Sequence, residues 1–254
     1  MLKSFSVRIL IAILALVLAS LACSPGVSAE PTEIPATNTP QPLPTNTTEP
    51  TFTPKPTATP NIIATEVSKR KAELSGLIRE YYNAGYLPSV EGEFFVLPDF
   101  DEDWAQIKYY RWWRMDLSAS TFVMSGHLSW SSAIEYPDIS GCGFAFGASE
   151  IEAFAVFVDK DRILFVNANG DEVGKTRGSG RVSFSLPAEA DFTLIVNAEA
   201  DKAYALVNGE FIGEYPLNQD KTISGQIGYS ILSGTNKDFG THCEITNAGL
   251  WIIE

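Results

Sequence analysis

Aromatic rings alternate with hydrogen-bonding side chains in the segment 107–117, IKYYRWWRMDL. In a strand, successive side chains point to opposite faces, so Tyr110, Trp112 and Arg114 are predicted to share one face. In the next predicted strand, His127 lies opposite the apolar residues expected in the core. Sugar recognition requires rings that stack on the sugar beside polar groups that bind its hydroxyls. These four residues are therefore candidate ligand-binding residues, and simple packing on an outer face is the alternative.

The chain contains three cysteines, Cys23, Cys142 and Cys243. Cys23 belongs to the export signal described below, which places the rest of the chain in an oxidising compartment. The remaining even pair within one domain predicts a disulfide between Cys142 and Cys243, with two separate buried thiols as the alternative. His242 is adjacent to Cys243, but the chain has only two histidines, too few soft ligands for a structural zinc site.

Acidic residues gather just before the aromatic segment. They supply the hard oxygen ligands that calcium prefers, and a plain acidic loop is the alternative. The residues concerned are Asp99, Asp101, Glu102 and Asp103.

The segment Asp191–Leu217 predicts three antiparallel strands. Phe192, Leu194 and Val196 alternate with polar residues, and 200–202 turns the chain. Asn208-Gly209 then predicts a tight hairpin, because both residues tolerate positive φ. Short strands separated by turn residues fill the chain from residue 93 onward, so the fold class is all-β, one antiparallel sandwich domain over 93–254.

The expected strands cover 93–97, 107–117, 120–131, 142–148, 152–158, 163–168, 181–186, 191–199, 203–208, 211–215, 223–232 and 242–253, and tight turns are expected at 169–171 and 178–180.

The hairpin YALVNGEFIGEY (204–215), followed by GQIG (225–228), resembles the closing half of concanavalin A-like (laminin-G-like) jelly rolls. The resemblance implies a jelly-roll β-sandwich of the sugar-binding type. Family 16 glycoside hydrolases share this fold and carry a strand motif of Glu, hydrophobe, Asp, hydrophobe, Glu. Here Glu150-Ile151-Glu152 is followed by Ala153-Phe154, so the third acid is missing. Bacterial 3-keto-glycoside hydrolase-like domains also resemble this type, which keeps an enzyme as an alternative.

Residues 1–22 have the features of a signal peptide: a short basic region, the apolar run Ile9–Leu18, and small residues. Ser20-Leu21-Ala22-Cys23 resembles a bacterial lipobox, which implies lipidation of Cys23 and anchoring in a membrane through acyl chains. An ordinary cleaved signal and an uncleaved anchor helix are the alternatives. Residues 23–60 interleave prolines with threonines, and this low complexity predicts a disordered, extended linker.

One amphipathic helix is predicted over 61–86, with Asn61 as its N-cap and Gly85 as a left-handed C-cap. Apolar residues recur at helical spacing along it, namely Val67, Leu74, Leu77, Ile78 and Tyr81. The helix is expected to lie on the sandwich, and an oligomerisation or partner helix is the alternative.

Acidic residues outnumber basic ones by 31 to 18, which gives a net charge of −13 and argues against nucleic acid as a partner.

Taken together, these features predict a lipoprotein of the bacterial cell envelope, anchored in a membrane and facing outside the cytoplasm. Its sandwich would be a non-catalytic module that binds glycan, such as a cell-wall polysaccharide. A structural or adhesion module that contacts protein, and an enzyme, are the alternatives. Calcium apart, no cofactor or metal is expected.

Overall fold

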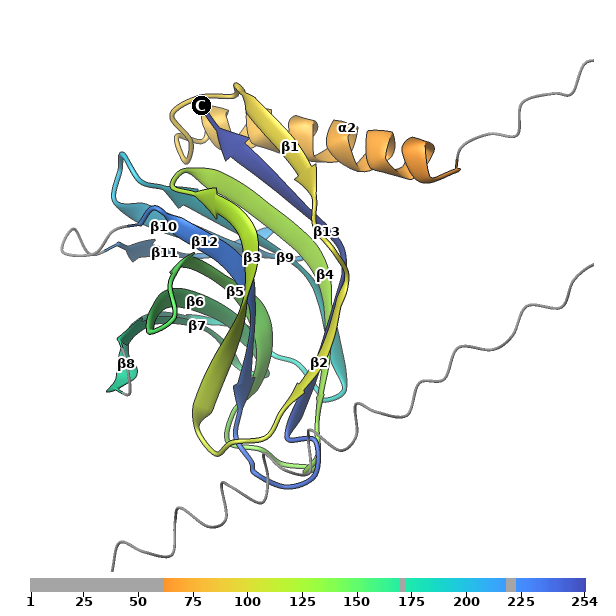
Figure 1. Ribbon diagram of the computed structural model, residues 1–254, viewed down its shortest axis with the longest axis vertical. Coiled ribbons are helices and arrows are strands. Elements are labelled where there is room, and N and C mark those ends of the chain that lie inside the picture. Colours follow the sequence, from red (N-terminus) through yellow and green to blue (C-terminus); the bar gives the residue numbers. More distant parts are fainter. Residues whose placement is uncertain (1–61, 170–171, 218–222) are drawn as a thin grey trace, which may run out of the picture. The chain divides into compact units, whose positions relative to one another are not determined.

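A computed structural model describes residues 62–169, 172–217 and 223–254 (Figure 1). The predicted signal peptide, Cys23 and the linker 23–60 lie outside these residues. Among the described helices, none is long and apolar enough to cross a membrane. The described chain begins with helix α2 (Ile62–Asn83) and continues as strands that form two antiparallel sheets.

Within the described ranges, sheet A has seven strands. Its strands are, from one edge to the other, β1 (Gly92–Val96), β13 (Thr241–Ile253), β4 (Phe122–Ser132), β9 (Ala188–Asn197), β10 (Lys202–Val207) and β11 (Glu210–Pro216), and β2 (Phe100–Trp104) pairs with β13 beside β1. Sheet B has six strands, in the order β3 (Tyr109–Ala119), β12 (Gly225–Ser233), β5 (Ser140–Ala148), β6 (Glu152–Asp159), β7 (Arg162–Asn169) and β8 (Glu172–Arg181). The predicted all-β antiparallel sandwich with one preceding helix is confirmed.

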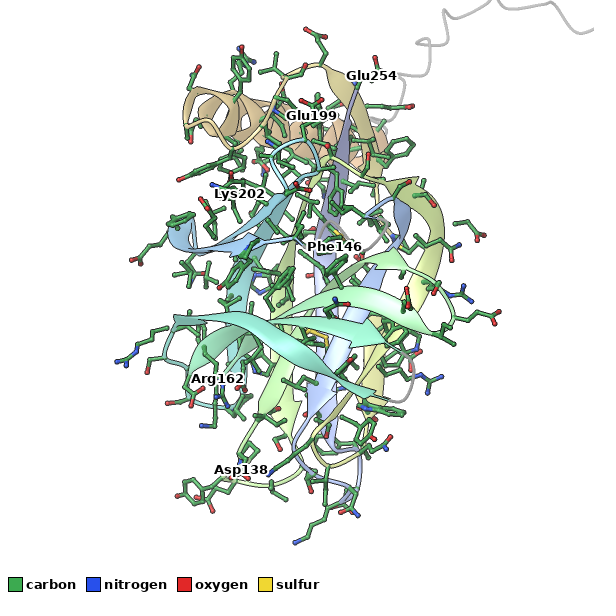
Figure 2. All side chains as sticks on the ribbon, turned by 90° about the vertical axis from the view of Figure 1, so that its left-hand side faces the viewer. Asp138, Phe146, Arg162, Glu199, Lys202 and Glu254 are labelled. Carbon is green, nitrogen blue, oxygen red and sulfur yellow. A yellow bond between two sulfur atoms is a disulfide. The ribbon has the colours of Figure 1, made fainter. Side chains whose placement is uncertain are left out.

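The main core lies between the two sheets and is rich in phenylalanine. Phe144 and Phe146 of β5, Phe154 of β6 and Phe192 of β9 are all fully or almost fully buried there. Figure 2 shows Phe146 in the interior of the sandwich. Since alternate residues of each strand point inward, both sheets have a second, outer face that remains available for other contacts.

Helix α2 covers part of the outer face of sheet A. Leu74, Ile78 and Tyr81 are buried against Val123 of β4 and Ile195 of β9. These contacts confirm that the helix lies on the sandwich.

The C-terminal end of the helix has the predicted geometry. Gly85 has a φ of 80°, and the Tyr86 N–H donates to the Tyr81 carbonyl at 2.9 Å. This bond pattern is the glycine-dependent C-cap expected from the sequence.

The predicted hairpin turn between β10 and β11 is also confirmed. Asn208 and Gly209 have φ values of 52° and 78°, and they connect Val207 to its cross-strand partner Glu210. The turn at 200–202 is present as well, with Asp201 at a φ of 52°. Both turns therefore follow from local residue chemistry.

Three local predictions are wrong. Residues 178–180 belong to strand β8 and do not form a tight turn, and β8 ends at Arg181, where a strand over 181–186 was expected. The acidic segment 100–104 is strand β2, because it pairs with β13. Of the turn at 169–171, residues 170 and 171 lie outside the described residues.

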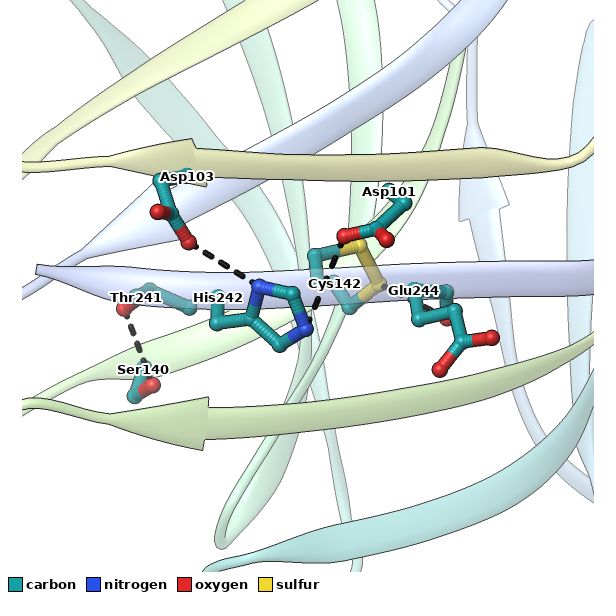
Figure 3. The surroundings of a disulfide bond; sticks show 8 residues. Asp101, Asp103, Ser140, Cys142, Thr241, His242 and Glu244 are labelled. Carbon is teal, nitrogen blue, oxygen red and sulfur yellow. Dashed lines mark hydrogen bonds and ion pairs between the residues drawn. A yellow bond between two sulfur atoms is a disulfide. The ribbon is translucent and has the colours of Figure 1, made fainter. Parts of the chain in front are cut away.

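Two neighbouring links join the sheets (Figure 3). The predicted disulfide is present between Cys142 of β5 and Cys243 of β13, with 5.6 Å between the Cα atoms. Two residues earlier on each strand, the hydroxyls of Ser140 and Thr241 form a buried hydrogen bond of 2.9 Å. The two sheets are thus fixed to each other at one end of the core.

Asp159, at the end of β6, is fully buried and accepts three hydrogen bonds. The donors are the backbone N–H groups of Ser140 and Lys160, each at 2.8 Å, and Arg162 Nε at 3.2 Å. Burial raises the pKa of Asp159, and these hydrogen bonds offset part of the rise. The folded protein therefore holds this proton more tightly than the unfolded chain does.

Because the folded protein binds the Asp159 proton more tightly than the unfolded chain, protonation of Asp159 adds to the free energy of unfolding at low pH. This contribution is lost as the pH rises through the raised pKa of Asp159. In Asp159→Asn this loss is absent. The free energy of unfolding of the variant should therefore improve relative to wild type as the pH rises from about 3 to about 6. Urea unfolding at a series of pH values measures the difference, and a difference independent of pH would contradict the assignment.

Candidate functional site

Strand β3 forms a free edge of sheet B, and its side chains divide between two faces as predicted. Trp113, Met115 and Leu117 pack against the main core. Tyr110 and Trp112 belong instead to apolar clusters on the outer face of the sheet. The sequence therefore assigned the register of this strand correctly, and the two outward rings lie next to each other, with centroids 6.0 Å apart.

Small residues form the floor of this outer face. Gly228 and Ser230 of β12 are paired with Arg114 and Trp112, and Gly143 of β5 is paired with Ser230 on the other side. Because these positions carry little side-chain volume, the Tyr110 ring reaches across to Phe157 of β6, at 5.8 Å between centroids. Ser230 is fully buried, and its hydroxyl has no hydrogen-bond partner among the described residues.

A shallow cleft of about 490 Å³ runs along the free edge of β3. It is lined by Trp104, Gln106, Tyr109, Tyr110, Arg111, Trp112, Arg114, Ser149 and Glu150. The half-buried Trp112 ring is fixed in place, because its Nε1–H donates to the Ser149 carbonyl of the β5–β6 turn at 3.2 Å. The cleft thus presents an oriented ring beside polar groups.

Two arginines of β3 border the cleft. The Arg111 guanidinium lies over the rings of Trp104 and Trp113, 5.2 Å and 5.0 Å from their centroids. Arg114 Nη2 lies 4.0 Å from Glu150 Oε1, an exposed and therefore weak ion pair. The arginines consequently bring cationic N–H donors to an edge that is rich in aromatic rings.

The structure brings together three of the four predicted ligand-binding residues, Tyr110, Trp112 and Arg114. The fourth, His127, was predicted to lie with them, but the structure places it elsewhere. It lies on β4, on the outer face of sheet A, and so on the opposite side of the sandwich. Its Nδ1 lies 2.9 Å from Asp191 Oδ1 on the neighbouring strand β9. His127 therefore cannot contribute to the cleft beside Trp112.

Sequence reasoning missed several cleft residues, notably Trp104, Arg111 and Tyr109. Tyr109 and Arg111 alternate with Tyr110 and Trp112, so the alternation alone places them on the other face of β3, where Arg111 meets Trp104 of β2 at the edge of the sandwich. Trp104 comes from β2, which was not expected to be a strand. The Arg111 stack on two tryptophans needs both strands to be placed, and no signal within a single segment predicts it.

The acidic residues expected to favour calcium are separated by the alternation of β2. Asp101 and Asp103 both lie beside His242, at 3.7 Å and 2.9 Å from its ring nitrogens (Figure 3). Glu102, between them in sequence, is on the other face of the strand. Within the described ranges, no group of three or more candidate ligands is arranged to hold a metal ion.

The two acids compared with the glycoside hydrolase motif are also separated. Glu150 lies in the β5–β6 turn at the rim of the cleft, whereas Glu152 begins β6. Phe154, at the position of the third acid of the motif, is buried in the main core, and the outward positions of β6 are Ala153 and Ala155. The described part of this face therefore offers no paired acids at its centre for the retaining mechanism.

No family model and no curated protein matches the chain. Solved structures with a similar fold include the carbohydrate-binding module CBM66 from Bacillus subtilis, with a TM-score of 0.47 and 8% identity over 61% of this chain and 92% of that one. The carbohydrate recognition domain of Emp47p gives a TM-score of 0.44 and 10% identity, covering 63% and 91%. A fructosyltransferase from A. japonicus gives 0.42 and 16%, covering 64% of this chain and 26% of that one.

A sheep galectin and an alginate lyase are also among the solved structures matched, each with a TM-score of 0.36. The chain spans about a quarter of the fructosyltransferase. At these identities and TM-scores, neither an activity nor a ligand is carried over to this chain.

Proposed function

We propose that this protein is a non-catalytic carbohydrate-binding module and that the cleft along β3 is its binding site. The observation that supports this most is the fixed Trp112 ring, oriented by Ser149 and bordered by Arg114. A planar ring next to fixed polar groups suits a sugar, which has one apolar face and a rim of hydroxyls. The central strands β5 and β6 offer small and apolar residues on this face, which favours binding over hydrolysis.

The proposal includes the location of the module. Cys23, in the lipobox-like sequence 20–23, would carry acyl chains that hold the protein in a membrane of the bacterial cell envelope. The proline- and threonine-rich linker 23–60 would then act as a spacer between that membrane and the sandwich. In this arrangement the cleft would meet polysaccharides outside the cytoplasm.

Trp112→Ala should weaken glycan binding by about 1–3 kcal/mol, since the ring supplies the stacking surface. The full-length protein in detergent is first screened on a glycan array, and the affinity for a bound glycan is then measured by calorimetry. Trp112→Phe keeps a ring but loses the hydrogen bond to Ser149, so it should bind with intermediate affinity.

Tyr136→Ala is a matched control, because this aromatic residue is 83% exposed and does not line the cleft. Melting curves show that each variant remains folded at the temperature of the binding measurement. Unchanged affinity in folded Trp112→Ala, or the absence of binding to any glycan on the array, would refute the proposed function.

A further inference from the structure

The charge of the cleft is opposite to that of the protein. The chain carries a net charge of −13, yet the charged residues that line the cleft are two arginines and one glutamate. On an acidic protein surface, a local excess of cationic groups attracts anionic ligands and disfavours cationic ones, whereas the rest of the surface does the opposite. The surroundings of the two arginines therefore indicate whether the cleft favours charged or neutral sugars.

Arg111 is held as a planar donor. Its guanidinium carbon lies over the rings of Trp104 and Trp113, 5.2 Å and 5.0 Å from their centroids, and the planar group carries five N–H donors. No carboxylate of the described residues forms an ion pair with Arg111. Stacking thus orients the group without neutralising its charge, an arrangement suited to an acceptor with two oxygens.

Arg114 is the second donor on the same strand, three residues further along and adjacent to Trp112. Its ion pair with Glu150 is long, 4.0 Å, and the two side chains are 39% and 85% exposed. An exposed pair of this length is easily exchanged for another anion. Glu150 itself adds a negative charge at the rim, and it should oppose an anionic ligand.

We propose that the ligand of this cleft is an anionic saccharide, one that carries carboxylate or sulfate groups, with Arg111 and Arg114 as the residues that bind those groups. This inference rests on the proposed carbohydrate-binding function. Guanidinium groups bind carboxylates and sulfates through paired N–H bonds, and Trp112, which lines the same cleft, supplies a stacking surface. Two arginines are too few for the extended basic footprint that nucleic acid requires.

The experiment compares each anionic oligosaccharide with its neutral counterpart. The probes are oligogalacturonate beside its methyl ester, oligomannuronate beside its methyl ester, and a sulfated galactan oligosaccharide beside its desulfated form. At least one anionic member should bind full-length protein about tenfold or more tightly than its counterpart, and added salt should reduce that preference.

Substitutions test the assigned residues. Arg111→Gln and Arg114→Gln should each weaken binding of the preferred anionic probe about 10- to 100-fold, with little effect on its neutral counterpart. Glu150→Gln should strengthen that binding, since it removes a like charge and releases Arg114. Arg79→Gln, on the exposed face of helix α2, is the matched control and should leave affinity unchanged.

The outcomes separate this inference from the proposed function. Equal binding of every anionic and neutral pair, with a loss of affinity in Trp112→Ala, would overturn the anionic ligand and leave the carbohydrate-binding function standing. Absence of binding to all probes and to the glycan array would overturn both. Because Arg111 contacts two tryptophans, melting of Arg111→Gln is measured in parallel, and the exposed Arg114→Gln keeps the inference testable if that variant unfolds.

Discussion

Removing the disulfide through the double variant Cys142→Ala, Cys243→Ala is expected to lower the free energy of unfolding by about 3–5 kcal/mol. The bond joins residues 101 positions apart, so it restricts a large part of the unfolded chain. It also connects strands of opposite sheets, next to the buried Ser140–Thr241 hydrogen bond. Urea unfolding of the oxidised wild type and the variant measures the change.

Wild-type protein reduced with dithiothreitol is the matched comparison, since it loses the bond without losing the sulfur atoms. It should unfold at nearly the same urea concentration as the double variant. An unchanged midpoint in both samples would show that the bond adds nothing to the stability of the sandwich.

Local residue chemistry was sufficient to predict most of the fold. The Asn208-Gly209 turn, the Gly85 helix end and the alternation of β3 each depend on neighbours within a few residues. The disulfide between Cys142 and Cys243 was predicted from the oxidising compartment expected for an exported protein and from the even number of remaining cysteines. Neither requires knowledge of the strand order. These features could be predicted because each depends either on residues within one segment or on the composition of the whole chain.

The candidate site was predicted only in part. The alternation of side chains along a strand shows which of them point away from the core, but it does not show to which of the two sheets the strand belongs. Trp112 and His127 both point outward from their strands. β3 belongs to sheet B and β4 to sheet A, so the two residues lie on opposite sides of the molecule. Sheet membership is fixed by pairing between distant segments, such as β3 with β12, and a single sequence does not reveal it.

The acidic strand β2 shows the same limit. Asp101, Glu102 and Asp103 have no apolar alternation, and their composition is typical of a loop. Phe100, buried in the main core, and Trp104, which packs against it, hold the two ends of the segment beside β13. Tertiary packing therefore overrides the local preference, and the same override places Trp104 beside Arg111 in the cleft.

Phe146→Ala is expected to cost about 3–5 kcal/mol of the free energy of unfolding, because it removes a ring from the centre of the core. Phe146 is fully buried and stacks on Phe154 of the neighbouring strand at 5.1 Å. It also meets Phe122 of the opposite sheet edge-to-face at 5.8 Å, so its loss leaves a cavity that both sheets line. Urea unfolding followed by circular dichroism measures the change.

Phe239→Ala is the matched control, because this ring is 39% exposed just before β13, and its removal should change stability by no more than about 0.5 kcal/mol. The contrast between the two variants separates burial in the core from the general effect of removing a phenylalanine. A loss below about 1 kcal/mol in Phe146→Ala, with cooperative unfolding retained, would mean that the sheets close over the vacated volume. The aromatic cluster would then not be what sets the spacing between the sheets.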